Sequence, residues 1–256
     1  MAKKIWLVGI GMGNRDTLTI GAWNILKNCD CLIGAQRMLD AFPELTCRRF
    51  AATAPEKIAA FLQEHPEFQT IGVVFSGDVG FYSGAKKLRS LFPEHLIEEC
   101  CGISTVAYLC AKLHTPWEDV RLVSAHGQAC NLAGEVRTHE KVFVLAGKVS
   151  AQELCKALCR AGLGGVTVSV GERLSYPEEA ITTGPAERLS GQTFDPLSAL
   201  LIQNPAPLSN DTLAFGLPDE RFIRGNTPMT KSEVRCISLS RLRLQRESIA
   251  WDIGAG

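Results

Sequence analysis

The chain has 256 residues, of which 46% are apolar, and its 27 Lys and Arg balance its 27 Asp and Glu. This length and composition suit one large domain or two modest ones with ordinary packed cores. The zero net charge provides no general electrostatic attraction to nucleic acid or to an anionic membrane, so neither is expected as a partner.

The first residues, MAKKIWLVGIGMGN, place two lysines before an apolar run, as a signal peptide does. Glycines interrupt that run, and no small-residue cleavage site follows. No apolar stretch approaches the roughly 20 residues that a membrane-spanning helix needs. We therefore expect a cytoplasmic protein without a membrane anchor.

The chain contains ten cysteines, but cytosolic thiols stay reduced, so disulfides are not expected. The spacings Cys29-x-Cys31, Cys100-Cys101 and Cys155-x3-Cys159 lack the paired C-x2-C pattern of structural zinc sites. We predict that most of these cysteines are small core residues and that the protein has no metal site.

Short β-branched runs alternate with amphipathic stretches along most of the chain. The predicted strands end in glycine or polar turns and cover residues 5–10, 71–77, 120–127, 141–147 and 165–171. The predicted helices cover residues 18–27, 55–64, 83–91, 105–113 and 151–161. Asp16 and Thr17 are candidate caps for the first helix. This alternation predicts an α/β protein.

The stretch LHTPWEDV, residues 113–120, is typical of a joint between subdomains, because Pro116 discourages helix continuation. We predict an N-terminal α/β subdomain over residues 1–114 and a C-terminal α/β subdomain over residues 115–204. The second contains two further predicted strands, at residues 178–184 and 197–204, which favour a mixed sheet.

The character of the chain changes after residue 204. Low periodicity and several prolines indicate a linker over residues 205–227. Residues 228–256 follow this linker. Their first part is a predicted helix, for which Thr230 and Glu233 form a predicted capping box. Their last part is the apolar run and glycine turn of SIAWDIGAG.

Three glycine-rich turns each lead from a strand into a predicted helix: GIGMGNRDTLT, FSGDVGFYSGAKKL and ECCGISTVAYL. The first departs from the G-x-G-x-x-G pattern of dinucleotide sites, because Asn14 stands where the third glycine belongs. The second offers exposed backbone amides and the carboxylate of Asp78 to a small zwitterion that carries adenosine. In the third, Ser104 and Thr105 could either cap a helix or bind a ligand.

In this order and at these intervals, the three turns resemble the tetrapyrrole methylase family. That family consists of S-adenosylmethionine-dependent enzymes with two α/β subdomains and the cofactor cleft between them. Its motifs are a first-strand glycine loop followed by Leu-Thr, then G-D-P-x-x-Y-G, then P-G-I-S-S; Met12, Val79 and Cys101 stand here at proline positions.

Further stretches resemble one branch of the family, which methylates carbon 5 of a late corrin precursor in cobalamin biosynthesis. They are LVSAHG, VSVGERLSYPEEAITTG and FDPLSALLI. The resemblance implies a C-methyltransferase that converts S-adenosylmethionine to S-adenosylhomocysteine. The alternatives are another corrin position, a ribosomal RNA substrate, or a non-catalytic cofactor-binding half of a larger assembly.

The resemblance also implies a set of site residues. Gly77, Asp78, Val79 and Phe81 would contact the methionine part of the cofactor, with Ser104 and Thr105 beside it, Leu145, Ala146, Glu172, Arg173 and Leu174 on the adenine side, and Met12 facing the substrate cleft. The catalytic residue stays unassigned. His126 is a candidate base, although a lone histidine after a strand is more often structural.

The tetrapyrrole's carboxylates need cationic or amide partners, for which Arg15, Arg37, Arg121 and Lys148 are candidates. Relatives are commonly homodimers. In fused relatives a second, Rossmann-type enzyme methylates carbon 15 and decarboxylates a side chain, and residues 228–256 resemble its opening. We expect this segment to be a truncated start that cannot bind cofactor by itself.

Overall fold

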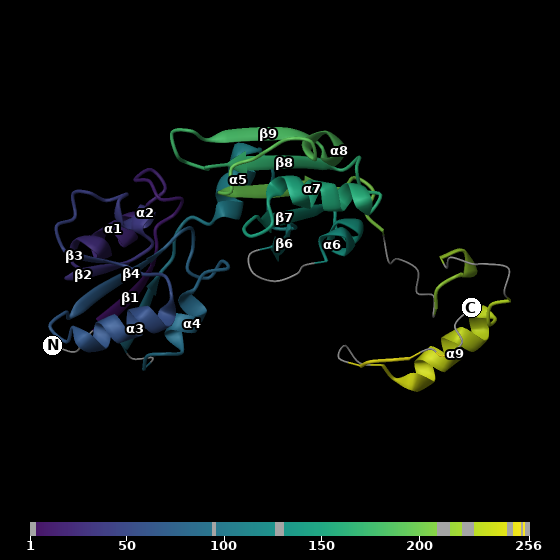
Figure 1. The fold of residues 1–256 in the computed structure, drawn as a ribbon, viewed down its shortest axis with the longest axis horizontal. Coiled ribbons are helices and arrows are strands. Elements are labelled where there is room, and N and C mark those ends of the chain that lie inside the picture. Colours follow the sequence, from purple (N-terminus) through teal and green to yellow (C-terminus); the bar gives the residue numbers. More distant parts are fainter. Residues whose placement is uncertain are drawn as a thin grey trace. The chain divides into compact units, whose positions relative to one another are not determined.

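The computed structural model describes residues 4–93, 96–125, 131–208, 216–221, 228–244, 248–251 and 253. The chain divides into two compact units, Met1–Leu208 and Ser209–Gly256. The first unit holds two five-stranded sheets covered by helices (Figure 1). The predicted α/β class is confirmed.

The first sheet is parallel and has the strand order β3-β2-β4-β1-β5. Its strands are β1 (Lys4–Gly9), β2 (Cys31–Gly34), β3 (Arg48–Ala51), β4 (Thr70–Phe75) and β5 (Ile97–Cys100). One face packs against α3 (Pro55–Glu64) and α4 (Ala85–Arg89), and the other against α1 (Ile20–Lys27) and α2 (Gln36–Leu39). Alternate side chains of β1, such as Leu7 and Val8, point to opposite cores, which explains its continuous apolar run.

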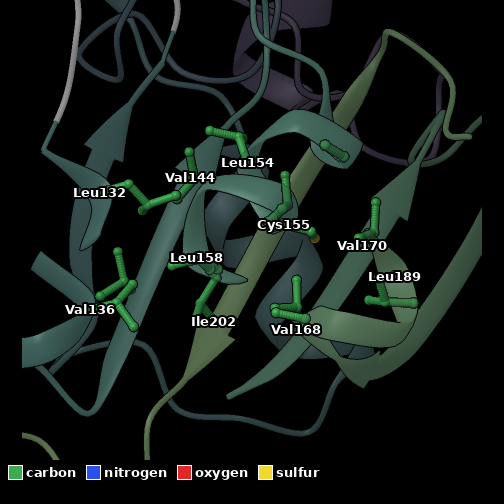
Figure 2. Packing of buried hydrophobic residues seen from close by; sticks show 14 of the residues in the cluster. Leu132, Val136, Val144, Leu154, Cys155, Leu158, Val168, Val170, Leu189 and Ile202 are labelled. Carbon is green, nitrogen blue, oxygen red and sulfur yellow. The ribbon is translucent and has the colours of Figure 1, made fainter. Parts of the chain in front are cut away.

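The second sheet is mixed, as predicted, with the order β6-β7-β10-β8-β9. Its strands are β6 (Arg121–Ser124), β7 (Lys141–Leu145), β8 (Thr167–Glu172), β9 (Ala180–Pro185) and β10 (Ser198–Gln203). Only the β6–β7 pair is parallel among its neighbours. The helices α6 (Leu132–Thr138), α7 (Ala151–Arg160) and α8 (Ala186–Leu189) cover one face. Figure 2 shows Leu154, Cys155 and Leu158 of α7 over this face of the sheet.

The other face of the second sheet packs against α5 (Thr105–Lys112). Leu109 and Cys110 of this helix are fully buried with Phe143 and Leu201 of the sheet. The chain therefore leaves β5 of the first sheet and enters a helix that belongs by packing to the second. The division at residue 114 stays a prediction, but α5 ties the two sheets together.

The helix boundaries correct one prediction. Neither Asp16 nor Thr17 caps α1; the N-cap is Thr19, whose side chain accepts from the Ala22 N–H at 3.1 Å. Thr17 is buried, and its hydroxyl accepts from the Met12 N–H at 3.0 Å and contacts Asn14. Thr17 thus shapes the first glycine loop instead of starting the helix.

A Thr19→Ala variant is expected to lose about 1 kcal/mol of unfolding free energy, because one amide in the first turn of α1 loses its acceptor. Urea unfolding followed by circular dichroism measures the change. Thr19→Ser keeps the acceptor and is the matched control. Equal stability of the alanine variant and the wild type would contradict the capping role.

Of the nine described cysteines, four are buried in the cores and three more pack half-buried against them, in line with the prediction that most are core residues. The four buried cysteines are Cys29, Cys31, Cys110 and Cys155. Burial raises the pKa of Cys29 and of Cys31 to about 12 and that of Cys155 to about 11. These thiols are protonated near neutral pH and are poor nucleophiles. Cys101, by contrast, is exposed, and all nine cysteines among the described residues are free.

The second unit contains a 3-10 turn, η2 (Asp219–Arg221), and the helix α9 (Ser232–Leu242). The predicted capping box is wrong, because the N-cap is Lys231 and no side chain accepts at this end. Arg235 of α9 donates to Asp219 at 2.6 Å and thereby links the two elements. The apolar side chains of α9, including Ile237 and Leu242, are about 60% exposed (61% and 60%).

Across the described part of the chain, every helix is too short or too polar to cross a bilayer.

Candidate functional site

Two glycine loops cross at the carboxyl edge of the first sheet. In the first sheet β4 lies between β1 and β2, and β1 lies between β4 and β5. The chain therefore passes over β4 on its way from β1 to β2, and over β1 on its way from β4 to β5. As a result, the loops that leave β1 and β4 pass each other. They meet as an antiparallel bridge between Gly11 and Gly77. The Gly11 N–H donates to the Gly77 carbonyl at 3.1 Å, and the Gly77 N–H donates to the Gly11 carbonyl at 2.6 Å.

The turn after β5 packs into the same place. A Cβ on Gly102 would lie against the Gly77 carbonyl oxygen and 2.6 Å from the Gly9 carbonyl carbon. Both neighbours are backbone atoms, which cannot rotate away. The three loops therefore pack backbone to backbone, which requires glycine at this crossing.

The carboxylate of Asp78 ties the second loop to the third. Its Oδ1 accepts from the Gly80 N–H at 2.8 Å, and its Oδ2 accepts from the Gly102 N–H at 2.9 Å. The side chain predicted to contact a ligand is thus engaged within the protein. Its clear role is to hold the loops in register.

A cavity of about 420 Å³ opens beside the crossing loops and is lined by residues of both sheets. Its walls are mainly apolar, with hydroxyl groups from residues such as Thr53, Ser76 and Ser198. Arg37 supplies the cationic side chain of the lining, and no carboxylate accompanies it among the described lining residues. A mainly apolar cavity with few polar groups is typical of small-molecule sites.

The predicted site residues divide into those that line this cavity and those that support it. Lining residues are Met12, Phe81, Thr105, Leu145, Ala146 and Leu174. They come from the first two glycine loops, the start of α5, the end of β7 and the loop after β8. Residues far apart in the sequence are therefore brought together around one space.

The remaining predicted residues are not among its lining: Gly77, Asp78, Val79, Ser104, Glu172 and Arg173. Ser104 is the N-cap of α5 and accepts from the Ala107 N–H at 3.4 Å, while Glu172 accepts from the Asp195 N–H at 2.7 Å. Arg173 pairs with Asp195 at 3.3 Å and with Glu178 at 3.4 Å. These contacts are within the protein and position neighbouring lining residues.

The loop between β8 and β9 presents Leu174 and Tyr176 to the cavity. Arg173 and Ser175 adopt positive φ values of 45° and 70°, a conformation that is costly for residues other than glycine. The GERLSYPEE stretch carries part of the family resemblance, but Tyr176 was not predicted as a lining residue. Its signal was an aromatic residue beside a proline in an otherwise polar loop.

Glu179 holds this loop in place. Its carboxylate accepts from the Tyr108 hydroxyl at 2.7 Å and the Ser175 N–H at 2.5 Å, and it pairs with Lys112 Nζ at 2.8 Å. Partial burial by itself raises the pKa of Glu179, but the hydrogen bonds from Lys112, Tyr108 and the Ser175 amide outweigh it and leave the pKa below its ordinary value. The loop is thus fastened to α5 by a charged carboxylate.

The candidate cations have different surroundings. Arg15 pairs with Glu44 and stacks on Trp23, with its guanidinium carbon 4.1 Å from the ring centroid. Arg121 pairs with Glu135 at 2.9 Å, which raises the pKa of the guanidinium. Lys148 is exposed and is not among the cavity's lining residues. Arg37 alone of the four lines the cavity.

His126, the candidate base, lies outside the described residues.

Comparison with known proteins gives a match to the model of the tetrapyrrole (corrin/porphyrin) methylases over residues 4–190. The chain is 28% identical over 207 residues to a probable cobalt-precorrin-7 C(5)-methyltransferase of Methanocaldococcus jannaschii, covering 78% of this chain and 97% of that protein. It is 25% identical over 264 residues to a precorrin-6Y C(5,15)-methyltransferase (decarboxylating) of Sinorhizobium sp. That alignment covers 98% of this chain but only 62% of the longer protein.

A shorter stretch of 42 residues is 52% identical to a probable cobalt-precorrin-6B C(15)-methyltransferase (decarboxylating) of Pyrobaculum calidifontis, covering 16% of this chain and 22% of that protein. Among solved structures, the uroporphyrin-III C-methyltransferase of Thermus thermophilus in complex with S-adenosylhomocysteine has a TM-score of 0.66 at 18% identity. It covers 78% of this chain and 92% of that one. The precorrin-6Y methylase of Archaeoglobus fulgidus has a TM-score of 0.61 at 22% identity, covering 78% and 97%.

Proposed function

Because the chain belongs to the tetrapyrrole (corrin/porphyrin) methylase family, we propose that it transfers a methyl group from S-adenosylmethionine to carbon 5 of a late corrin precursor in cobalamin biosynthesis. The cavity between the two sheets, beside the crossing glycine loops, carries this proposal. The names of the Methanocaldococcus and Sinorhizobium relatives support the carbon 5 position.

The residues at the cavity fit a molecule with an adenine ring and a methionine part. Met12, Phe81 and Leu174 offer apolar surface to the ring and to the sulfur-bearing chain. Thr105 and Ser198 add hydroxyl groups to the same lining, and these can donate to or accept from the polar parts of such a molecule.

We assign roles on this basis. Phe81, Thr105, Leu145, Ala146 and Leu174 contact the cofactor, and Met12 lies between the cofactor and the substrate. Gly77, Asp78 and Val79 shape the second loop, which places Phe81 in the cavity lining. Ser104, Glu172 and Arg173 position the lining residues next to them.

When bound, S-adenosylmethionine supplies the methyl group: its carbon–sulfur bond breaks as an electron pair of the ring carbon forms the new carbon–carbon bond. The protein's residues contribute alignment, since holding two reactants in register supplies much of the rate. The apolar walls exclude water from the reacting atoms. A proton must leave the methylated carbon if the ring is to keep its conjugation, and His126 stays the candidate acceptor.

We propose that residues 1–114 and 115–204 form the two subdomains, that 205–227 is a linker, and that 228–256 is the start of a C(15)-methyltransferase domain. The short Pyrobaculum match and the longer Sinorhizobium relative support a fused or partner domain of this kind. Ile237 and Leu242 of α9 are exposed, as expected of a helix that packs against further protein.

A cytoplasmic location, which rests on the sequence, and a homodimeric state, which rests on the resemblance, belong to the same proposal. Light scattering coupled to size-exclusion chromatography measures the second.

The decisive assay incubates the chain with methyl-labelled S-adenosylmethionine and a panel of late precorrins, with and without cobalt. We expect label in one tetrapyrrole and, by NMR, a new methyl group at carbon 5. Retention of S-adenosylmethionine without transfer to any precorrin would favour a non-catalytic cofactor-binding half. Transfer to ribosomal RNA instead would favour the RNA-modifying branch.

A further inference from the structure

We propose that Arg37 is the anion-binding subsite of the cavity and binds one side-chain carboxylate of the tetrapyrrole. This inference rests on the proposed function and adds a residue that determines substrate affinity and specificity.

The charge distribution around the cavity carries the argument. Its described lining is neutral apart from Arg37, so this guanidinium is the charged side chain that a ligand meets among the described lining residues. The other candidate arginines, Arg15 and Arg121, already pair with carboxylates of the protein. No described carboxylate lies within ion-pair distance of Arg37. A carboxylate from the substrate would therefore be the first anion to pair with it.

The guanidinium has donors to spare. Arg37 Nη1 donates to the Tyr176 hydroxyl at 2.8 Å, and among the described residues the guanidinium makes no other hydrogen bond. Because a guanidinium carries five N–H donors, the others remain for a ligand, and two of them can bind a carboxylate in bidentate fashion. Tyr176 comes from the second sheet's β8–β9 loop, so this contact also fixes the guanidinium across the cavity.

The short helix that carries Arg37 is held in place. Arg49 on β3 donates to the carbonyls of Leu39, Phe42 and Leu45 at 3.1, 2.6 and 2.8 Å. These bonds fasten the end of α2 and the turn after it to the sheet, and Leu39 is buried beneath the helix. An exposed arginine on a fixed backbone loses less conformational entropy on binding than one on a free loop.

Substitution of Arg37 separates substrate affinity from cofactor affinity. In Arg37→Gln we expect the Kd for cobalt-precorrin-7 to rise about 10-fold, from the loss of a charge-assisted hydrogen bond, with the Kd for S-adenosylhomocysteine unchanged. Calorimetry measures both constants. The salt dependence of precorrin binding should also weaken, because one ion pair is lost.

Further variants sharpen the test. Arg37→Lys keeps the charge without the planar fork and should fall between the wild type and Arg37→Gln. Tyr176→Phe should raise the precorrin Kd by only about 2- to 3-fold, because Arg37 keeps its charge and loses only the hydrogen bond that orients its guanidinium. Arg160→Gln, an exposed arginine on α7 outside the cavity, is the matched control.

The outcomes distinguish this inference from the proposed function. An unchanged precorrin Kd in Arg37→Gln, beside normal binding by the wild type, overturns the Arg37 subsite and leaves the function standing. An equal loss of S-adenosylhomocysteine and precorrin affinity also overturns it, because it indicates a structural role. If the wild type binds S-adenosylhomocysteine but no precorrin, the proposed substrate fails and the inference fails with it.

Discussion

A Gly102→Ala variant is expected to lose about 3 kcal/mol of unfolding free energy and most of its affinity for S-adenosylhomocysteine. The new Cβ would meet the backbone of Gly77 and lie 2.6 Å from the Gly9 carbonyl carbon. Overpacking of this kind usually costs about 1–3 kcal/mol, and the high end applies because the neighbours are backbone. The three loops would have to separate, which would also displace Met12 and Phe81.

Gly165→Ala is the matched control, because a Cβ there meets nothing within 4 Å and its φ is not in the left-handed region. Its unfolding free energy should change by less than about 0.5 kcal/mol. Chemical denaturation measures stability, and calorimetry measures cofactor affinity. If Gly102→Ala binds the cofactor and unfolds like the control, the packing of the crossing loops is wrong.

A Glu179→Ala variant should lose about 2–3 kcal/mol of unfolding free energy and weaken cofactor binding. It removes the acceptor of the Tyr108 hydroxyl and the Ser175 N–H and leaves Lys112 without its carboxylate. The loop that carries Leu174 then loses its tether to α5. Denaturation and calorimetry again measure the two effects.

Glu178→Ala provides the comparison, since Glu178 is exposed and its 3.4 Å pair with Arg173 is a surface ion pair. Such pairs contribute about 0–1 kcal/mol. Equal stability loss in Glu178→Ala and Glu179→Ala would argue against Glu179 as the tether.

The same carboxylate gives the stability a pH dependence. The folded pKa of Glu179 lies below its unfolded value, so its contribution is fully present above the unfolded pKa, near 4.5, and is lost as the pH falls through the folded pKa. The stability difference between the wild type and Glu179→Gln should therefore shrink below about pH 4. A constant difference across the acid range would mean that the carboxylate's charge plays no part.

Much of the fold is encoded locally and could be predicted. Continuous β-branched runs predicted the buried strands at residues 5–10 and 71–77. The proline and the apolar periodicity of residues 55–64 predicted both ends of α3. The short elements β3, α2, α6 and α8 were not predicted, because four to seven residues carry too little periodicity.

Start signals of helices were less decisive than their interiors. Thr17 and Thr19 are equivalent as sequence-level caps, and the choice between them depends on the first glycine loop, in which Thr17 accepts from Met12. Ser104 could cap or bind a ligand, and its place at the start of α5 makes it a cap.

By itself, the sequence determined the α/β class, the glycine-rich turns after three strands and the family resemblance, because strand periodicity and glycine spacing are properties of neighbouring residues. Only the tertiary structure decided that α5 packs under the second sheet, that Asp78 bonds to Gly102, and that Arg37 faces Tyr176 across the cavity. These contacts join residues 24 and 139 positions apart in the last two cases. They depend on how two sheets pack, which no local pattern encodes.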